Sequence, residues 1–155
     1  MSQRTSYAKA APGVYKTMLG MHQYLEHCGL DERLLNLVYL RASQINGCAY
    51  CIDMHWKDLR TLGVPEQTLY MLNAWWEWPE FADRERAALA WTDAVTRLTN
   101  QEVSDEVYEK ARAQFSDEEL ANLTLAVTAI NSWNRLNIAF RTKPGGYQPV
   151  RRVSA

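Results

Sequence analysis

Two cysteines and a histidine stand close together in the sequence, at spacings that could support thiol chemistry. Cys48, Cys51 and His55 follow one another at intervals of three and four residues. On a helix, where successive residues are rotated by about 100°, all three fall within an arc of roughly 60°. A neighbouring imidazole can accept a thiol proton and so produce the reactive thiolate. Two sulfurs beside one base permit a redox cycle, in which one sulfur becomes a sulfenic acid and the other condenses with it to a disulfide.

The expected position of this pair within its helix favours the same chemistry. Asn46-Gly47 is a break in the helical pattern, so Cys48 is predicted in the first turn of the next helix. Unpaired amides and the helix dipole stabilise a thiolate at that end. Ile52 and Leu59 share the face of the two cysteines, so we expect the thiols and the imidazole on the apolar side of the helix.

Other roles for the pair remain open at this point. Zinc usually takes four ligands from two separated segments, and the remaining soft donors are His22, His27 and Cys28. Covalent haem attachment requires a histidine directly after the second cysteine, where Ile52 stands. A thioredoxin-like site lacks its βαβ surroundings, and a purely structural pair is the last alternative. We expect Cys28 to be a small buried hydrophobe, and the two other histidines to be surface or capping residues.

Helices are the elements that must position these residues, because apolar side chains recur at helical spacing and no useful strand-like alternation occurs. We predict an all-α bundle of about six to seven helices. They are expected over residues 14–28, 31–45, 48–62, 65–78, 83–98, a short segment after Ser104, and 116–141. Asp83 and Ser104 are predicted N-caps, and Ser116 with Glu119 has the spacing of a capping box.

The length and composition indicate one globular domain. The chain has 155 residues, of which 47% are hydrophobic and 23% charged, as in ordinary folded proteins. We assign a single domain to residues 1–155, with a core over about 13–142 and a tail over 143–155. The tail contains Arg151 and Arg152 and has little to bury, so we expect it to be loose or packed on a partner.

Charge and cysteine content exclude several classes of protein. Lys and Arg total 17 against 18 Asp and Glu, so no basic excess is available for nucleic acid. The longest uncharged stretch, residues 120–134, is interrupted by polar side chains and is too short to span a membrane. No apolar leader is visible at the N-terminus, and three cysteines cannot all pair within one chain. We therefore expect a cytoplasmic protein that binds neither nucleic acid nor membrane.

Six tryptophans are unusual for a chain of this size. Trp75, Trp76 and Trp78 stand together, and large aromatic side chains more often supply core or subunit-interface area than a ligand pocket. The expected helix over 31–45 is apolar around most of its axis, which suggests burial on several sides. These features predict a homo-oligomer.

Two segments resemble a known family. The run from Leu40 to Cys51, LRASQINGCAYC, together with His55, is similar to the AhpD-like alkylhydroperoxidase branch of the carboxymuconolactone decarboxylase superfamily. The run from Asn131 to Leu136, NSWNRL, supports the same assignment. The resemblance extends over about residues 13–150.

The resemblance implies an all-helical fold that assembles into trimers or hexamers, and thiol-dependent reduction of hydroperoxides. By that scheme Cys51 becomes the sulfenic acid, Cys48 resolves it, and His55 relays the proton. A dithiol or lipoyl-bearing protein would reduce the oxidised pair, with no metal, flavin or other cofactor.

The sequence departs from the family pattern at two positions of the proton relay. The family commonly has a glutamate twelve residues before the first cysteine, where this chain has Asn36. An amide can orient an imidazole but cannot accept its proton, and Glu32, one turn earlier, is a candidate substitute. Some members have a histidine between the cysteines, where this chain has Tyr50. A phenol there can donate a hydrogen bond but is a poor base near neutral pH.

Two further functions are compatible with the resemblance. One is a decarboxylase-like or isomerase-like enzyme acting on a small lactone or ring acid, which would not need the thiols. The other is a non-catalytic assembly or binding module that keeps the scaffold alone.

Overall fold

The computed structural model describes residues 2–149, and every regular element in that part of the chain is helical. The α-helices are α1 (Tyr7–Ala10), α2 (Pro12–Leu25), α3 (Glu32–Asn46), α4 (Ala49–Thr61), α5 (Glu66–Met71), α6 (Asp83–Arg97), α7 (Asp105–Arg112) and α8 (Asp117–Phe140). Two short 3-10 turns, Leu72–Ala74 and Thr99–Gln101, follow α5 and α6. The all-α single domain is confirmed. Helices α2 to α8 are the seven expected ones, and α1 is a four-residue addition.

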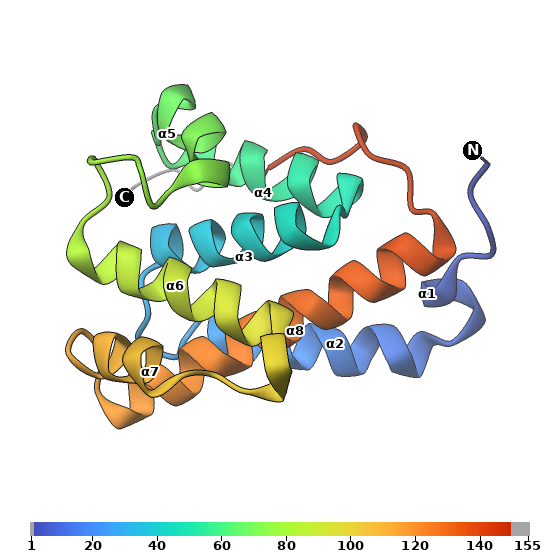
Figure 1. Ribbon diagram of the computed structural model, residues 1–155. Helices are drawn as coiled ribbons and strands as arrows, with labels where there is room; N and C mark the ends of the chain where they lie inside the picture. Colours follow the sequence, from blue (N-terminus) through green and yellow to red (C-terminus); the bar gives the residue numbers. More distant parts are fainter. Residues whose placement is uncertain (1, 150–155) are drawn as a thin grey trace.

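Helix α3 is the centre of the fold, with α4, α6 and α8 packed around it (Figure 1). Its residues are apolar on several sides, and Leu37, Val38, Leu40 and Ala42 are completely buried. Such a helix gains its stability from burying side chains on all sides rather than along one stripe. The surrounding helices therefore form a shell that holds α3 and the following turn in place.

Side-chain caps fix several of the helix starts at the expected residues. Ser104 accepts a hydrogen bond from the amide of Val107, and Ser116 forms a reciprocal capping box with Glu119. Helix α6 differs by one residue, because the N-cap position is taken by Ala82 and not by Asp83. The reason is that Glu85 accepts a hydrogen bond from the Ala82 amide, so its side chain satisfies the helix start.

The tryptophans after α5 belong to a second, smaller core. Trp75 and Trp78 pack against a cluster that includes Leu69 and Phe81, whereas Trp76 is half exposed. The guanidinium of Arg86 donates hydrogen bonds to the backbone carbonyls of all three tryptophans. This region is therefore a packed corner that is separate from the cysteine pair.

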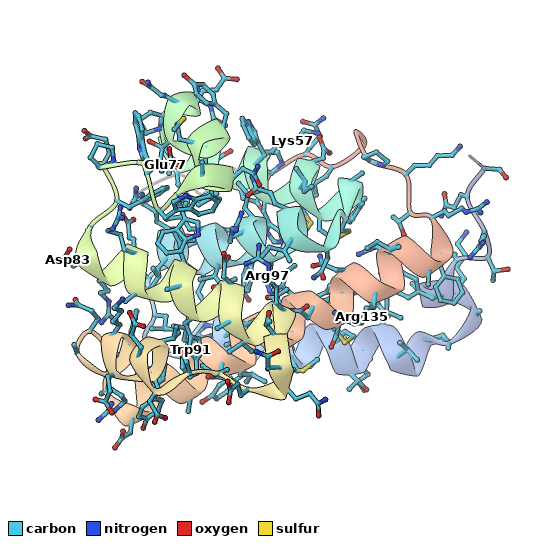
Figure 2. The ribbon with its side chains drawn as sticks, in the orientation of Figure 1. Lys57, Glu77, Asp83, Trp91, Arg97 and Arg135 are labelled. Carbon is cyan, nitrogen blue, oxygen red and sulfur yellow. A yellow bond between two sulfur atoms is a disulfide. The ribbon has the colours of Figure 1, made fainter. Side chains whose placement is uncertain are left out.

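The segment that follows α8 turns back and packs on α4, where Lys57 is labelled in Figure 2. The ammonium of Lys57 donates to the carbonyls of Gly145 and Tyr147, at 3.4 and 3.0 Å. The amide of Gly145 donates to the carboxylate of Asp53 at 3.0 Å. The tail is thus not loose at Gly145 and Tyr147, which bind to α4, whereas its packing on a partner stays a prediction. Arg151 and Arg152 lie outside the described residues.

No helix among residues 2–149 is both long enough and apolar enough to cross a membrane.

Candidate active site

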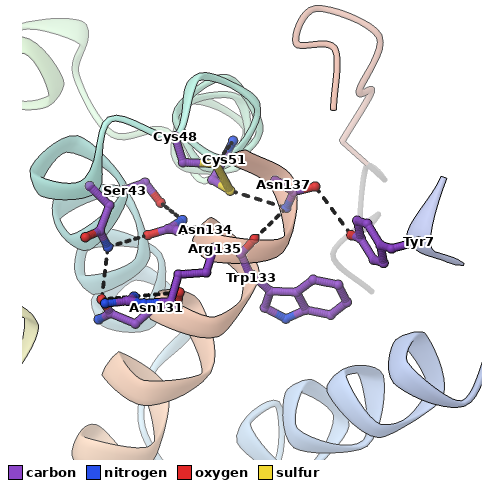
Figure 3. Close-up of a disulfide and its surroundings, with 10 residues drawn as sticks. Tyr7, Ser43, Cys48, Cys51, Asn131, Trp133, Asn134, Arg135 and Asn137 are labelled. Atoms are coloured by element: carbon purple, nitrogen blue, oxygen red, sulfur yellow. Dashed lines mark hydrogen bonds between the residues drawn. A yellow bond between two sulfur atoms is a disulfide. The ribbon is translucent and has the colours of Figure 1, made fainter. Parts of the chain in front are cut away.

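The turn between α3 and α4 presents the two cysteines. Gly47 ends α3 with a left-handed backbone (φ 70°), a conformation that glycine adopts without steric cost. Cys48 is the N-cap of α4 rather than a residue of its first turn, because its Sγ accepts a hydrogen bond from the Cys51 amide at 3.4 Å. A disulfide joins Cys48 and Cys51, whose Cα atoms are 5.4 Å apart (Figure 3). The pair is therefore a disulfide at a helix start, the position at which a thiolate of a Cys-X-X-Cys pair is stabilised.

A network of amide side chains fixes this turn to α8. Asn46 donates to the side-chain oxygens of Asn131 and Asn134, at 2.9 Å each, and Asn134 donates to Ser43 Oγ at 3.0 Å (Figure 3). Asn134 and Ser43 are completely buried, and buried polar groups that are mutually satisfied hold a single geometry. The network thus connects the two segments that carry the family resemblance.

A cavity of about 430 Å³ lies beside the pair, between α2, α3, α4, α8 and the C-terminal segment. Cys51 and His55 belong to its wall, whereas Cys48 does not line it. The rest of the lining combines aromatic rings with aliphatic and polar side chains. The rings are those of Tyr7, Tyr15, Tyr39, Tyr50, Trp133 and Tyr147. The cavity is large enough to admit a small organic molecule next to Cys51.

Hydrogen bonds fix the proton positions on the imidazole of His55. The Asn36 amide donates through Nδ2 to the backbone carbonyl of Glu32 at 3.0 Å, so its Oδ1 faces His55. That oxygen is 3.1 Å from His55 Nδ1. Because an amide oxygen only accepts, Nδ1 carries the hydrogen and Nε2 carries the lone pair. Nε2 is buried and has no hydrogen-bond partner among the described residues, which leaves it available to accept a proton.

The surroundings of His55 keep its imidazole neutral. Burial, with a smaller contribution from nearby His22, lowers the pKa of His55 from 6.5 to about 3. The ring lies 5.0 Å from the ring of Tyr39 and only 4% of the residue is exposed. A neutral imidazole with a free Nε2 is the form that acts as a base.

Asp58 is a site residue that sequence reasoning missed. Its Oδ2 is 3.7 Å from His55 Nδ1, and its Oδ1 accepts a hydrogen bond of 2.7 Å from the hydroxyl of Tyr147. Burial raises the pKa of Asp58, although the hydrogen bond from Tyr147 lowers it. The three-residue spacing from His55 is the signal that could have found Asp58, whereas the contact with Tyr147 spans 89 residues.

Asn137 is the second missed residue, one position beyond the NSWNRL segment. Its Nδ2 lies 3.5 Å from Cys51 Sγ and also donates to the carbonyl of Trp133 at 3.0 Å. Its Oδ1 accepts from the hydroxyl of Tyr7 at 3.3 Å (Figure 3). The amide is therefore oriented with its donor toward sulfur, the arrangement that stabilises a thiolate.

The remaining candidate residues also lie at the cavity. Glu32 and Tyr50 both line it, and burial raises the pKa of the Tyr50 phenol. His22, expected on the surface, is half exposed and also contributes to the cavity wall. His27 lies two residues beyond the end of α2, and its Nδ1 is 3.0 Å from the Gln23 carbonyl in the last turn of that helix.

Cys28 is a free thiol that is partly buried against the main core, and it does not line the cavity. Within residues 2–149, no group of three or more His, Cys, Asp and Glu side chains is arranged to hold a metal ion.

Comparison with known proteins identifies the family. The model of the carboxymuconolactone decarboxylase family matches residues 12–94. YdfG of Bacillus subtilis, which is uncharacterised, is 40% identical over 139 residues, covering 90% of this chain and 95% of YdfG. The chain therefore belongs to the carboxymuconolactone decarboxylase family.

Solved structures place it in the AhpD-like branch of that family. ATU0492 of Agrobacterium tumefaciens, a protein of unknown function assigned provisionally to antioxidant defence as AhpD, is 42% identical with a TM-score of 0.90. The match covers 94% of this chain and all of that one. A peroxidase-related protein of Ralstonia eutropha shares the fold at 20% identity, with a TM-score of 0.79 and coverages of 90% and 74%.

Proposed function

We propose that the protein reduces organic hydroperoxides through the Cys48–Cys51 pair, with His55 as the proton relay. One observation carries the proposal: a cysteine pair at a helix start opens, through Cys51, on a cavity shared with a neutral imidazole whose Nε2 has no hydrogen-bond partner within residues 2–149. The provisional link of the similar Agrobacterium protein to antioxidant defence supports it.

The first step would form a thiolate at Cys51. His55 Nε2 accepts the thiol proton, so the S–H bond breaks and an N–H bond forms. The thiolate attacks the terminal oxygen of the hydroperoxide, the O–O bond breaks, and the departing alkoxide takes the proton from His55. Cys51 is then a sulfenic acid, and the peroxide has become an alcohol.

The second step would return the site to a stable oxidised state. The sulfur of Cys48 attacks the sulfenic sulfur of Cys51, and water leaves with the thiol proton. The resulting disulfide is the form that the structure contains. Thiol exchange with a dithiol, such as a lipoyl-type protein reductant, restores both thiols and oxidises the reductant. No cofactor is required for these steps.

A single-turnover experiment tests this function. The reduced protein is mixed with cumene hydroperoxide and its intact mass is measured. We expect a loss of about 2 Da with no added oxygen, which is the signature of a Cys48–Cys51 disulfide.

Two cysteine variants separate the proposed roles. Cys48→Ser should gain about 16 Da, because the sulfenic acid at Cys51 cannot be resolved. Cys51→Ser should consume no peroxide, and Cys28→Ser is the matched control that should behave as the unaltered protein. Unchanged peroxide consumption by Cys51→Ser would overturn the proposal.

The family match also supports a second candidate, a decarboxylase-like enzyme for a small lactone or ring acid. Such a reaction would use the cavity but not the thiols. Turnover of a lactone by protein with both cysteines alkylated would favour this candidate over the first.

A non-catalytic binding module is a further alternative. In such a protein the thiols of Cys48 and Cys51 would have pKa values near the ordinary ~8.5.

We also propose that the protein forms a trimer or hexamer and works in the cytoplasm, where a dithiol reductant is available. Exposed large side chains such as Tyr70, Trp76 and Ile138 are candidates for subunit contact. A monomeric mass in light scattering at micromolar concentration would refute the oligomer.

A further inference from the structure

We propose that Asp58, fixed by Tyr147, is the counter-ion for the imidazolium that His55 becomes when it accepts the proton of Cys51. This inference rests on the proposed role of His55 as a base. It adds Asp58 on α4 and Tyr147 on the C-terminal segment as positioning residues. In this chain Asn36 stands at the position where the family pattern has a glutamate.

The two carboxylate oxygens of Asp58 have different neighbours. Oδ1 accepts the hydrogen bond from Tyr147 at 2.7 Å, which fixes the rotamer of the side chain. Oδ2 is thereby left toward His55, 3.7 Å from Nδ1. The His55 and Asp58 side chains are only 6% and 21% exposed. A charge pair in such surroundings is screened much less than one in water.

A counter-ion is needed because the burial of His55 makes its protonated form unfavourable. The proton transfer breaks the S–H bond of Cys51 and forms an N–H bond at Nε2, and no electrons are exchanged with another molecule. It leaves an imidazolium with two N–H donors. The Asn36 oxygen accepts from Nδ1 but is neutral, so it orients the ring without compensating its charge. The carboxylate of Asp58 supplies the missing negative charge.

Other titratable groups face the same cavity from neighbouring elements. They are Tyr15 and His22 on α2, Glu26 at its C-cap, Glu32 and Tyr39 on α3, Tyr50 on α4, Tyr7 on α1 and Tyr147 on the C-terminal segment. His22 opposes a positive charge on His55 and lies 3.8 Å from Glu26. Within residues 2–149, Asp58 supplies the carboxylate that lies within 4.0 Å of a ring nitrogen of His55.

Asp53 provides a matched control on the same helix. Both aspartates bind the C-terminal segment, Asp53 through the Gly145 amide and Asp58 through the Tyr147 hydroxyl. Only Asp58 also approaches His55. Asp53→Asn therefore tests whether attachment of the segment is sufficient, whereas Asp58→Asn removes the charge and keeps an acceptor for Tyr147.

The experiment measures the reactivity of Cys51 in a Cys28→Ser, Cys48→Ser background, where it is the one thiol in the chain. Alkylation by iodoacetamide is followed from pH 5 to pH 10. We expect Asp58→Asn to raise the apparent pKa of the thiol by about one unit, which slows alkylation at pH 7 about tenfold. Tyr147→Phe should shift the profile less and in the same direction, and Asp53→Asn should stay within about twofold of the background.

A rescue variant separates a loss of charge from a loss of structure. Asn36→Glu, added to Asp58→Asn, puts a carboxylate on the other neighbour of His55 Nδ1, and we expect it to restore most of the rate. An unchanged pH profile in Asp58→Asn would overturn the inference. So would an equal loss in Asp53→Asn, because the segment alone would then explain the effect.

The outcomes distinguish this inference from the proposed function. A normal peroxide-driven disulfide in the unaltered protein, with Asp58→Asn alkylated at the background rate, rejects the counter-ion and keeps the peroxidase. Slow alkylation in Asp58→Asn, without any peroxide consumption by the unaltered protein, supports the counter-ion and rejects the peroxidase.

Discussion

Helix α3 carries two buried polar clusters, little more than one turn apart, that differ in how completely their polar atoms are paired. In the first, Arg41 is 2% exposed and donates through Nε and Nη2 to both carboxylate oxygens of Asp93, at 2.6 and 2.7 Å. Its Nη1 reaches Asn73. In the second, Asn36 binds one nitrogen of His55 and the other nitrogen has no partner among the described residues.

The difference teaches how to distinguish a structural cluster from a chemical one. A bidentate Arg–Asp pair in which every guanidinium nitrogen has a hydrogen-bond partner fixes the packing of α3 on α6. Burial alone would raise the pKa of Asp93, but hydrogen bonds from Arg41 and Arg97 bring it below its usual value. An unpaired buried nitrogen costs stability. Beside a cavity and Cys51, this unpaired nitrogen is the group that the proposed proton transfer would use.

Breaking the structural cluster should give the largest effect on stability. Arg41→Met leaves the carboxylate of Asp93 without its main partner, and we expect the free energy of unfolding to fall by about 3 kcal/mol. Urea denaturation measures the change. Replacement of both partners, Arg41→Met with Asp93→Leu, should recover most of the loss, because no buried charge remains.

The same variant tests whether the two clusters are independent. Alkylation of Cys51 in folded Arg41→Met should stay within about twofold of the unaltered rate, since residues without shared partners act additively. A large fall in thiol reactivity would mean that Arg41 belongs to the chemical cluster.

An intermediate effect is expected from acid, through His55. The folded protein holds the pKa of His55 at about 3, whereas the unfolded chain has the ordinary 6.5. The unfolded state therefore binds the proton first, and the stability present above pH 6.5 is lost as the pH falls toward 3. Between pH 7 and pH 5 this contribution amounts to about 2 kcal/mol.

Denaturation of the oxidised protein at both pH values measures it, with His55→Gln as the control. The control lacks the titrating group, so its loss between pH 7 and pH 5 should be smaller by that amount. An equal loss in both proteins would show that His55 is protonated in the folded state.

The smallest effect is expected at the donor to sulfur. Asn137→Ala removes the hydrogen bond to Cys51 and should slow alkylation of that thiol about fivefold, close to 1 kcal/mol. Asn122 is a matched control on the same helix, since it also accepts from a tyrosine hydroxyl and donates to a carbonyl. Asn122→Ala should lose similar stability without a change in thiol reactivity. Equal rates in the two variants would remove Asn137 from the site.

Much of the fold could be predicted from local sequence because its determinants are local. Ser116 and Glu119 cap each other across three residues, and Gly47 ends α3 where the Asn-Gly break predicts. Helix α6 starts one residue earlier than the sequence predicts. The Glu85 side chain accepts a hydrogen bond from the Ala82 amide, so this start does not need a polar side chain at the N-cap. The contacts of Gly145 could not be predicted from local sequence, because its partners, Asp53 and Lys57, are about 90 residues away.

The sequence by itself determined that Cys51 and His55 share one face of a helix and that Cys48 stands at its start, because helical spacing is a property of a short segment. The tertiary structure decided which groups surround them. The cavity beside Cys51, the hydrogen bond between Asn36 and His55, and the contacts of Asn137 and Asp58 all join segments that are distant in the chain. Burial, which lowers the pKa of His55, is likewise set only when α2, α3, α4 and α8 pack together.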